Sequence, residues 1–378
     1  MIIKNHNKSK IIIIGPAYPL RGGIANFNEA MCRALMEAGH EVEIVSFTLQ
    51  YPGFLFPGKT QKAEGDQHPR GIKVTSLISS VNPLSWFKAA SYISKQHPDK
   101  VIIRYWLPFM GPCLGTIARL IKRKSKKTEI IGLCDNVIPH ESRSGDFAFT
   151  KYFTGGCDSF VVMSQSVLED LRKFDQVKPV KLKPHPVYDI FGEPVSKFEA
   201  RKTLQLEQDA RYVLFFGFIR KYKGLDLLLR AFADESVKST GARLIVAGEF
   251  YEDKKPYLDL IDSLGLKDAV LLHDHYIPKE AVRHYFCAAD LVAQPYRDAT
   301  QSGVTQIAYH FSKPMLVTNV GGLPEIVPHG EAGFVTDTTP ESIASAIAAF
   351  YEKNLEESLT AGVKRKAKDF SWEKFVRE

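Results

Sequence analysis

The sequence predicts an α/β fold with two doubly wound domains, each built on a parallel sheet. Apolar runs of strand length alternate with segments of helical periodicity through both halves of the chain, which is typical of parallel sheets covered on both faces. With 378 residues the chain is too long for one ordinary core, and its 44% hydrophobic and 25% charged residues are typical of a soluble globular protein. We expect one domain over residues 1–190 and another over residues 191–360.

In the first domain, strands and helices alternate after a short polar segment. Residues 49–71 are rich in Gly, Pro and polar residues and predict a long loop. Residues 180–192, with prolines within and near them, predict the linker between the domains. The expected strands lie at residues 10–15, 41–47, 101–104, 129–133 and 159–164, and the expected helices at residues 24–38 and 114–123.

The same alternation continues in the second domain, after residue 191. Because the loops that follow parallel strands gather at one edge of the sheet, ligands are expected to bind there. The expected strands lie at residues 212–216, 243–247, 269–272, 291–294, 315–318 and 333–335, and the expected helices at residues 225–232, 253–264, 280–288, 304–311 and 340–352.

Composition excludes several classes of protein. The first ten residues lack the apolar run of a secretory signal, and no stretch approaches the roughly 20 apolar residues that cross a bilayer. We expect a cytoplasmic protein, peripheral at most at the inner face of the membrane. The five cysteines lack metal-type spacing, and the close pair His273 and His275 has no third ligand in view, so we expect neither a disulfide framework nor a metal site.

A strand, a glycine and two spaced cations form the most informative motif. The apolar run ending at Phe216 is followed by Gly217, Arg220 and Lys223, and then by the amphipathic segment 225–232. Cations beside the start of a helix favour phosphate groups. The alternative is an ordinary strand-to-helix turn with solvated cations.

A second polar loop lies about eighty residues further on. Residues 300–303 separate an expected strand from an expected helix, so backbone amides of Ser302, Gly303 and Val304 are expected to face phosphate, with Gln301 beside them. Gly321-Gly322 then follows another strand and leads to Glu325. This carboxylate is suited to sugar or ribose hydroxyls, or to a helix first turn.

The first domain also carries polar residues at expected strand ends. Gly22 and Gly23 allow a backbone turn to approach a ligand, or form only a tight turn. Arg104 and Trp106 follow one strand, where Trp106 either stacks on a sugar ring or fills the core. Asp135, Asn136, His140 and Glu141 follow the next strand and are expected at the ligand edge, where a histidine or carboxylate orients a hydroxyl, although a proline-flanked loop is also consistent with a structural role.

Together these motifs resemble the retaining glycosyltransferases of family 4, and the resemblance covers nearly the whole chain. The segments that carry it are Gly22-Gly23, Asp135-Asn136, His185-Pro186, Arg220 with Lys223, Lys313-Pro314 and Gly321-Gly322-Leu-Pro-Glu325. The resemblance implies the GT-B architecture, with two Rossmann-like domains facing across a cleft. It also implies that residues 361–378 form a helix crossing back to the first domain.

The resemblance further implies transfer of a sugar from a nucleotide-diphosphate sugar to a saccharide or lipid-linked acceptor, without a metal or other cofactor. Arg220 and Lys223 would stabilise the departing diphosphate and His140 would act at the acceptor. Donor contacts would come from Gly22, Gly23, Gly217, residues 301–304 and Glu325. The acceptor side would contain Asp135, Asn136, Glu141, Arg104 and Trp106.

Two departures from the family pattern concern the donor site. The family commonly has two glutamates around the phosphate loop, but Ala299 and Ile307 stand at these positions, and a shift by one residue gives Asp298 and Gln306. Phe218 occupies the usual position of the diphosphate arginine, so Arg220 is expected to replace it from two residues later.

Three other functions remain open. A dinucleotide-dependent oxidoreductase is disfavoured because the first turn lacks the G-x-G-x-x-G spacing. A sugar-nucleotide epimerase would use the same architecture without an acceptor. A non-catalytic nucleotide-sugar-binding protein would agree with the missing glutamates.

The net charge of +7 favours anionic partners, and nucleotide sugars, anionic lipids and nucleic acid all qualify by charge. Of these, we do not expect nucleic acid to bind. The densest basic run extends from Arg119 to Lys127. It predicts either contact with an anionic membrane surface or a solvated helix end.

Overall fold

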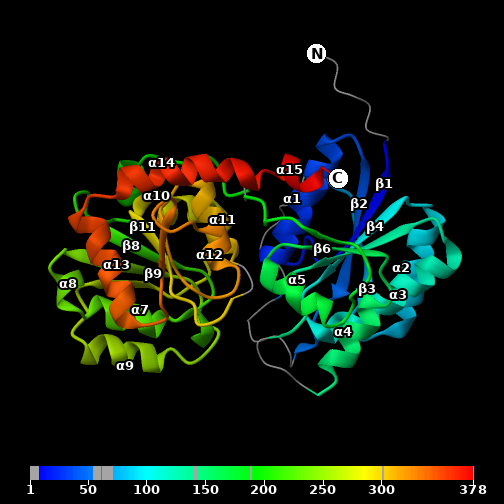
Figure 1. Ribbon diagram of the computed structural model, residues 1–378, viewed down its shortest axis with the longest axis horizontal. Helices are drawn as coiled ribbons and strands as arrows, with labels where there is room; N and C mark the ends of the chain where they lie inside the picture. Colours follow the sequence, from blue (N-terminus) through cyan, green and yellow to red (C-terminus); the bar gives the residue numbers. More distant parts are fainter. Residues whose placement is uncertain are drawn as a thin grey trace, which may run out of the picture. The chain divides into compact units, whose positions relative to one another are not determined.

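The computed structural model describes residues 8–53, 61, 71–139, 144–187, 190–299 and 302–377. Two compact units divide the chain: unit 1 comprises Met1–His185 with Trp372–Glu378, and unit 2 comprises Pro186–Ser371. Each unit contains one parallel sheet with helices around it (Figure 1). The predicted α/β class with two parallel-sheet domains is confirmed.

Unit 1 is built on a seven-stranded parallel sheet. The interior strand β1 (Lys10–Ile14) contains four isoleucines that are at most 3% exposed, because an interior strand of a parallel sheet is buried on both faces. The strand order is β3-β2-β1-β4-β5-β6-β7. The other strands are β2 (Glu41–Leu49), β3 (Val74–Ser79), β4 (Lys100–Tyr105), β5 (Glu129–Cys134), β6 (Ser159–Val162) and β7 (Val180–Leu182).

The helices of unit 1 follow the strands in the order typical of doubly wound folds. Helices α2 and α3 pack side by side, and α3 also packs on α4 (Figure 1). The unit contains α1 (Gly23–Glu37), α2 (Pro83–Lys95), the short 3₁₀ helix η2 (Pro108–Met110), α3 (Gly111–Lys124), α4 (Asp146–Thr154), α5 (Gln165–Arg172) and α15 (Trp372–Val376).

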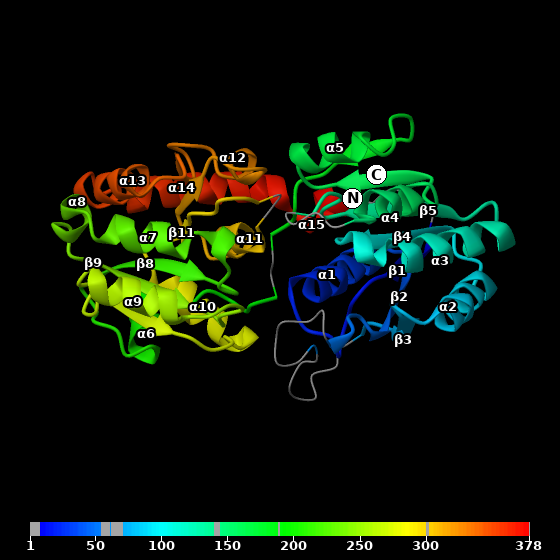
Figure 2. The same ribbon diagram turned by 90° about the horizontal axis from the view of Figure 1, so that it is seen from below.

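Unit 2 is built on a six-stranded parallel sheet of order β10-β9-β8-β11-β12-β13. Helix α7 packs on α13 and α6 packs on α10, so that helices flank the sheet (Figure 2). The strands are β8 (Arg211–Phe216), β9 (Ala242–Ala247), β10 (Val270–His273), β11 (Leu291–Gln294), β12 (Met315–Thr318) and β13 (Gly333–Thr336). The helices are α6 (Lys197–Thr203), η3 (Lys221–Lys223), α7 (Leu225–Phe232), α8 (Glu235–Lys238), α9 (Lys255–Ser263), α10 (Lys279–Ala288), α11 (Gly303–His310), α12 (Leu323–Ile326), α13 (Pro340–Glu352), α14 (Glu356–Ala367) and η4 (Lys368–Phe370).

Some elements of unit 1 escaped sequence reasoning, among them β3, α2 and α4. Helix α2 carries recognisable start signals, since Asn82 caps it by accepting the Leu84 N–H and Pro83 is its first residue. The predicted linker at residues 180–192 begins too early, because β7 pairs with β6 through Val180–Leu182. Most of the predicted loop at residues 49–71 lies outside the described residues.

The C-terminal segment returns to unit 1 later than residue 361. Helix α14 belongs to unit 2, where Val363 is buried and the Phe370 ring packs 4.9 Å from that of Tyr309. Only the stretch from Trp372 onward belongs to unit 1, where the Phe375 ring lies 5.6 Å from that of Phe27 in α1. The chain returns later than predicted because the apolar face of α14 is already buried within unit 2.

Candidate active site

Two glycines shape the carboxyl edge of the unit 2 sheet. Gly217 follows β8 with φ +100°, and Gly248 follows β9 with φ +151°. A Cβ atom at residue 248 would lie 2.1 Å from the carbonyl oxygen of Gly217. Only glycine permits this approach of the two loops, and Gly217 itself is half-buried.

Lys223 is buried beside this backbone. Its Nζ lies 3.1 Å from the position that a Cβ of residue 217 would take and 5.5 Å from the ring centroid of Tyr296. The side chain enters here because η3 ends at Gly224, which has φ +68° and approaches the Pro295 carbonyl too closely for any Cβ. Lys223 is only 9% exposed.

The Lys223 ammonium has no counter-ion within the part of the chain that the structure describes. Burial, and secondarily the charge of Arg220, lowers the pKa of Lys223 to about 8. A buried cation without an acidic neighbour is unfavourable unless an anion joins it. The site is therefore suited to an anionic ligand.

Arg220 lies at the start of η3 and is exposed to solvent, with its guanidinium carbon 5.1 Å from the ring centroid of Tyr251. Of the two cations in the sequence motif, Arg220 is solvated, as expected for an ordinary strand-to-helix turn, whereas Lys223 is buried. The Arg220 charge contributes to the lowered pKa of Lys223, so the two cations belong to one region of positive potential.

Helix α11 brings the second predicted loop to the same place. The Val304 side chain lies 3.8 Å from the Cβ position of Gly217. Ser302 caps the helix, and its Oγ accepts the Val304 N–H at 3.2 Å. The Val304 amide is therefore not directed at a ligand as expected, and the exposed Gly303 is the better donor. Gln301 lies outside the described residues.

Two buried glutamines near this loop were not predicted as site residues. Gln294 ends β11 and Gln306 lies in α11, and the amide nitrogen and oxygen of each have no hydrogen-bond partner among the described residues. Such unsatisfied groups are rare in protein interiors. Ala299 and Ile307, at the family's glutamate positions, are buried apolar residues. Glu325 is exposed in the first turn of α12.

In unit 1, Arg104, Asp135 and Asn136 lie at the carboxyl ends of β4 and β5. Arg104 Nε donates to Asp135 Oδ2 at 2.7 Å, and Nη2 donates to the other carboxylate oxygen. The guanidinium lies over the Phe27 ring at 3.9 Å. Burial raises the pKa of Asp135, although Arg104 opposes this effect.

Unsatisfied polar atoms accompany this ion pair. Arg104 Nη1 and the Asn136 side-chain oxygen are buried and have no hydrogen-bond partner among the described residues, and the same holds for the Asn28 side-chain oxygen. Asn28 was missed by sequence reasoning, because asparagine inside a helix carries no distinct signal. One donor and two acceptors thus remain available in this region.

The remaining predicted residues of unit 1 are placed differently. Gly22 precedes α1 with φ +116°, a conformation that favours glycine, and Gly23 is the first residue of the helix. Trp106 packs in the core against Phe47, and its indole N–H donates to Tyr51, which favours the core-filling alternative. His140 and Glu141 lie outside the described residues.

Among the described residues, no group of three or more potential ligands is arranged to hold a metal ion. His273 instead contacts the Tyr285 hydroxyl through Nδ1 at 2.8 Å. None of the described helices is both long enough and apolar enough to span a membrane.

Two family models match the chain, one in each half. The model described as Glycosyltransferase Family 4 matches residues 21–187, and the model described as Glycosyl transferases group 1 matches residues 196–369. The chain is 30% identical to D-inositol 3-phosphate glycosyltransferase 1 of Catenulispora acidiphila over 299 residues, which cover 74% of this chain and 70% of that protein. The chain belongs to the glycosyltransferase group 1 family.

Other relatives and solved structures agree with this assignment. An uncharacterised glycosyltransferase of Methanocaldococcus jannaschii is 24% identical over 98% of this chain and 96% of its own length. Several other D-inositol 3-phosphate glycosyltransferases match over only 44% to 53% of their length.

Among solved structures, sucrose-phosphate synthase from Thermosynechococcus elongatus has a TM-score of 0.76 at 18% identity, covering 97% of this chain and 96% of that one. Anabaena HepE in complex with UDP-glucose has a TM-score of 0.71 at 16% identity, with 96% of both chains covered. These similarities support the GT-B fold for this glycosyltransferase.

Proposed function

We propose that this glycosyltransferase moves a sugar from a nucleotide-diphosphate sugar to a saccharide or lipid-linked acceptor, with retention of the anomeric configuration and without a divalent metal. The observation that carries the proposal is the buried Lys223 ammonium beside Gly217 and α11, without a counter-ion among the described residues. A diphosphate would supply the missing negative charge. The UDP-glucose bound by HepE supports a donor of this class.

The chemistry follows from the position of these charges. The bond between the anomeric carbon and the diphosphate oxygen breaks, and its electron pair stays on that oxygen. Lys223 and Arg220 would stabilise this charge, and the Gly303 N–H would donate to a phosphate oxygen. The acceptor hydroxyl attacks from the same face and gives its proton to the departing phosphate.

Unit 1 would supply the acceptor side. Arg104 Nη1 and the Asn136 side-chain oxygen, which have no hydrogen-bond partner among the described residues, suit the hydroxyls of a saccharide. Asp135 would hold Arg104 in place. We assign His140 and Glu141 to the acceptor and Gly22, Gly23 and Glu325 to the donor. A lipid-linked acceptor would place the protein at a membrane surface in polysaccharide or glycolipid biosynthesis.

A non-catalytic nucleotide-sugar-binding protein is the second candidate. It is favoured by one observation, the buried apolar residues Ala299 and Ile307 at the positions of the family's glutamates. Turnover by the purified protein separates the two functions. Release of nucleoside diphosphate from the donor in the presence of an acceptor is expected for the transferase.

The donor assignment is tested by calorimetry with nucleoside diphosphates. Lys223→Met is expected to weaken binding at least tenfold, because it removes the buried positive charge. Lys221→Met is the matched control, since Lys221 lies in the same turn but is exposed. Equal affinities of wild type and Lys223→Met would overturn the assignment of this site.

A further inference from the structure

The net positive charge of the protein resides in unit 1. Unit 1 contains 28 Lys and Arg residues against 17 Asp and Glu residues, a net charge of +11. Unit 2 contains 22 basic and 26 acidic residues, a net charge of −4. The net +7 of the chain therefore conceals a strongly basic unit that is expected to be attracted to anionic surfaces.

Helix α2 combines this charge with exposed apolar side chains. Leu84 is 78% exposed and Phe87 is 54% exposed, although burial of such large apolar side chains is favourable. Lys88 and Lys95 are exposed on the same stripe, since the four positions follow the spacing i, i+3, i+4 and i+11 of one helix face. Neither α2 nor α3 contains an acidic residue.

Helix α3 extends the stripe at its C-terminal end. Lys124 of α3 donates through Nζ to the Ser91 hydroxyl of α2 at 3.1 Å, which places the ends of the two helices together. Arg123 and Lys127 are exposed beside it. We call the surface formed by Leu84, Phe87, Lys88, Lys95, Arg123 and Lys127 the α2–α3 face.

The predicted basic run is only partly available for a partner. Lys122 Nζ donates to the carbonyls of Lys126 and Thr128 and to Asp158, and Arg119 donates to the Gly115 carbonyl and lies over the Tyr152 ring. These two cations are committed to the fold. Arg123, Lys126 and Lys127 of the predicted run are exposed. The sequence prediction did not include Leu84, Phe87, Lys88 and Lys95 of α2.

We propose that the α2–α3 face binds the surface of an anionic phospholipid bilayer. Leu84 and Phe87 insert among the acyl chains near the headgroups, and the lysines and arginine contact lipid phosphates, as in other interfacial amphipathic helices. The charge complementarity favours lipid over a protein partner, because Lys88 and Lys95 share the stripe of the apolar residues and neither helix contains an acidic residue.

The inference deepens the proposed action on a lipid-linked acceptor by naming the surface that would hold the enzyme at the membrane. It does not require catalysis. Vesicle binding is measured without donor or acceptor, so its absence would contradict the membrane proposal and not the donor-site assignment. Absence of nucleotide binding in calorimetry would contradict the donor-site assignment and not the membrane proposal.

The test is sedimentation with vesicles of equal parts phosphatidylglycerol and phosphatidylcholine. The wild-type protein is expected to bind these vesicles and not vesicles of pure phosphatidylcholine. The double variant Leu84→Ser/Phe87→Ser is expected to lose at least tenfold in partitioning, and Lys88→Ser/Lys95→Ser is expected to bind more weakly with a reduced salt dependence. Phe198→Ser is the control, because Phe198 is 64% exposed in the acidic unit 2.

Insertion is tested separately with Phe87→Trp and lipids brominated in their acyl chains. Quenching of the added tryptophan beyond that of the wild type is expected, whereas Phe198→Trp is expected to show none. Absence of wild-type binding to anionic vesicles, or unchanged binding of the Leu84→Ser/Phe87→Ser variant, would overturn the proposal. If the α2–α3 face binds a protein instead of lipid, the Leu84→Ser/Phe87→Ser variant is expected to bind vesicles as the wild type does.

Discussion

At the scale of single residues, Lys223 shows the cost in stability of keeping a charge buried at a candidate binding site. Its ammonium is buried near Gly217 and Tyr296 and is not neutralised by an acid among the described residues. The lowered pKa expresses this cost, since one pKa unit corresponds to about 1.4 kcal/mol. The backbone glycines around it allow a ligand, instead of the protein, to provide the negative charge.

Replacement of Lys223 by methionine is expected to stabilise the folded protein while weakening nucleoside diphosphate binding. Removal of an unpaired buried charge is expected to raise the free energy of unfolding by about 3 kcal/mol at neutral pH. Urea denaturation at pH 7 measures this difference, with Lys221→Met as control. A destabilised Lys223→Met variant would show that the ammonium is satisfied within the fold.

The pH dependence of Lys223 has opposite signs for stability and binding. The pKa is near 10.5 in the unfolded chain and about 8 in the folded one, so the folded state holds fewer protons between these values. Stability therefore rises with pH across this window. Diphosphate affinity falls as pH rises through 8, because the ammonium loses its proton.

Calorimetry below and above pH 8, with Lys223→Arg for comparison, measures the binding part of this prediction. The arginine variant keeps its charge and is expected to show a flat profile. If diphosphate affinity falls equally with pH in the wild type and in Lys223→Arg, a group other than Lys223 is responsible for the titration.

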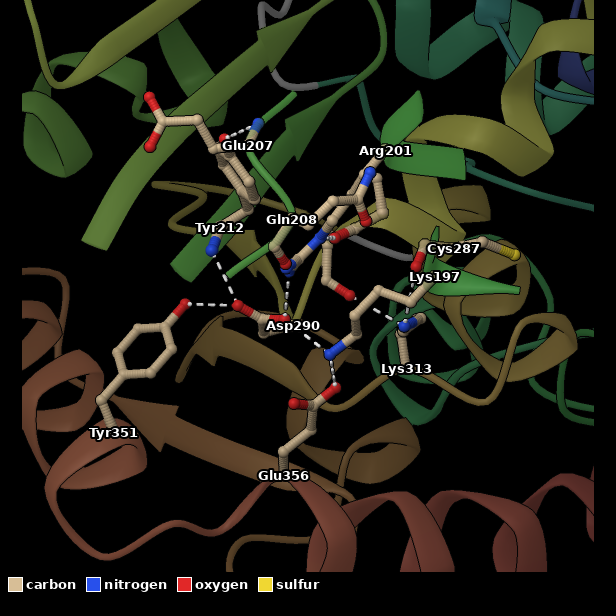
Figure 3. A network of polar contacts seen from close by, with 12 residues as sticks. Lys197, Arg201, Glu207, Gln208, Tyr212, Cys287, Asp290, Lys313, Tyr351 and Glu356 are labelled. Carbon is tan, nitrogen blue, oxygen red and sulfur yellow. Dashed lines mark hydrogen bonds and ion pairs between the residues drawn. The ribbon is translucent and has the colours of Figure 1, made fainter. Parts of the chain in front are cut away.

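At the scale of elements, the two edges of the unit 2 sheet differ in how their buried polar groups are paired. Among the described residues, the carboxyl edge leaves Lys223 without an acidic partner and the Gln294 and Gln306 amides without hydrogen bonds, whereas the amino edge is held by a polar network around Asp290 (Figure 3). Asp290 accepts from Lys197, from Arg201 and from the Tyr212 N–H, at 2.7, 2.9 and 2.7 Å. It thereby joins α6 and β8 to the start of β11.

Asp290→Ala is expected to lower the free energy of unfolding by about 3–5 kcal/mol, because it leaves the buried Arg201 without its carboxylate. Nucleoside diphosphate affinity of the folded protein is expected to stay unchanged, since the network lies at the opposite edge of the sheet. Glu235→Ala, which removes an exposed pair with Lys238, serves as control and is expected to cost at most about 1 kcal/mol. Comparable losses from both substitutions in thermal unfolding would contradict this account.

At the scale of the whole molecule, the chain leaves unit 1 after His185 and returns at Trp372. The returning helix α15 packs on Phe27, whose ring also supports the Arg104 guanidinium. Lys183 Nζ donates to the Phe375 carbonyl at 2.7 Å and so holds the end of the chain. The last residues of the sequence therefore help to form the candidate acceptor region of unit 1.

Phe375→Ala is expected to destabilise unit 1 by about 3 kcal/mol, because it removes a buried ring from the cluster around Phe27. Hydrogen exchange measures this effect by region. Amides of β1 and β4 are expected to exchange faster, while those of β8 and β9 remain unchanged. Equal acceleration in both units would indicate that the chain unfolds as one cooperative body.

The sequence by itself determined the fold class and most of its strands and helices. Helices α7 and α13 and strands β11 and β12 have the predicted limits, because hydrophobic periodicity and the glycine and proline signals at their ends are local properties of the chain. The spacing of Arg220 and Lys223 after β8 was likewise readable from the sequence.

Tertiary structure decided which of the predicted residues remain free to bind a ligand. Burial separates Lys223 from the solvated Arg220, places Trp106 in the core, commits Lys122 to the fold and leaves the Gln306 amide unsatisfied. These outcomes depend on neighbours that are distant in the sequence, such as Gly217 for Lys223 and Asp158 for Lys122. Local patterns indicate the type of a side chain and its position along an element, but its partners and its exposure arise only when the sheets and helices pack together.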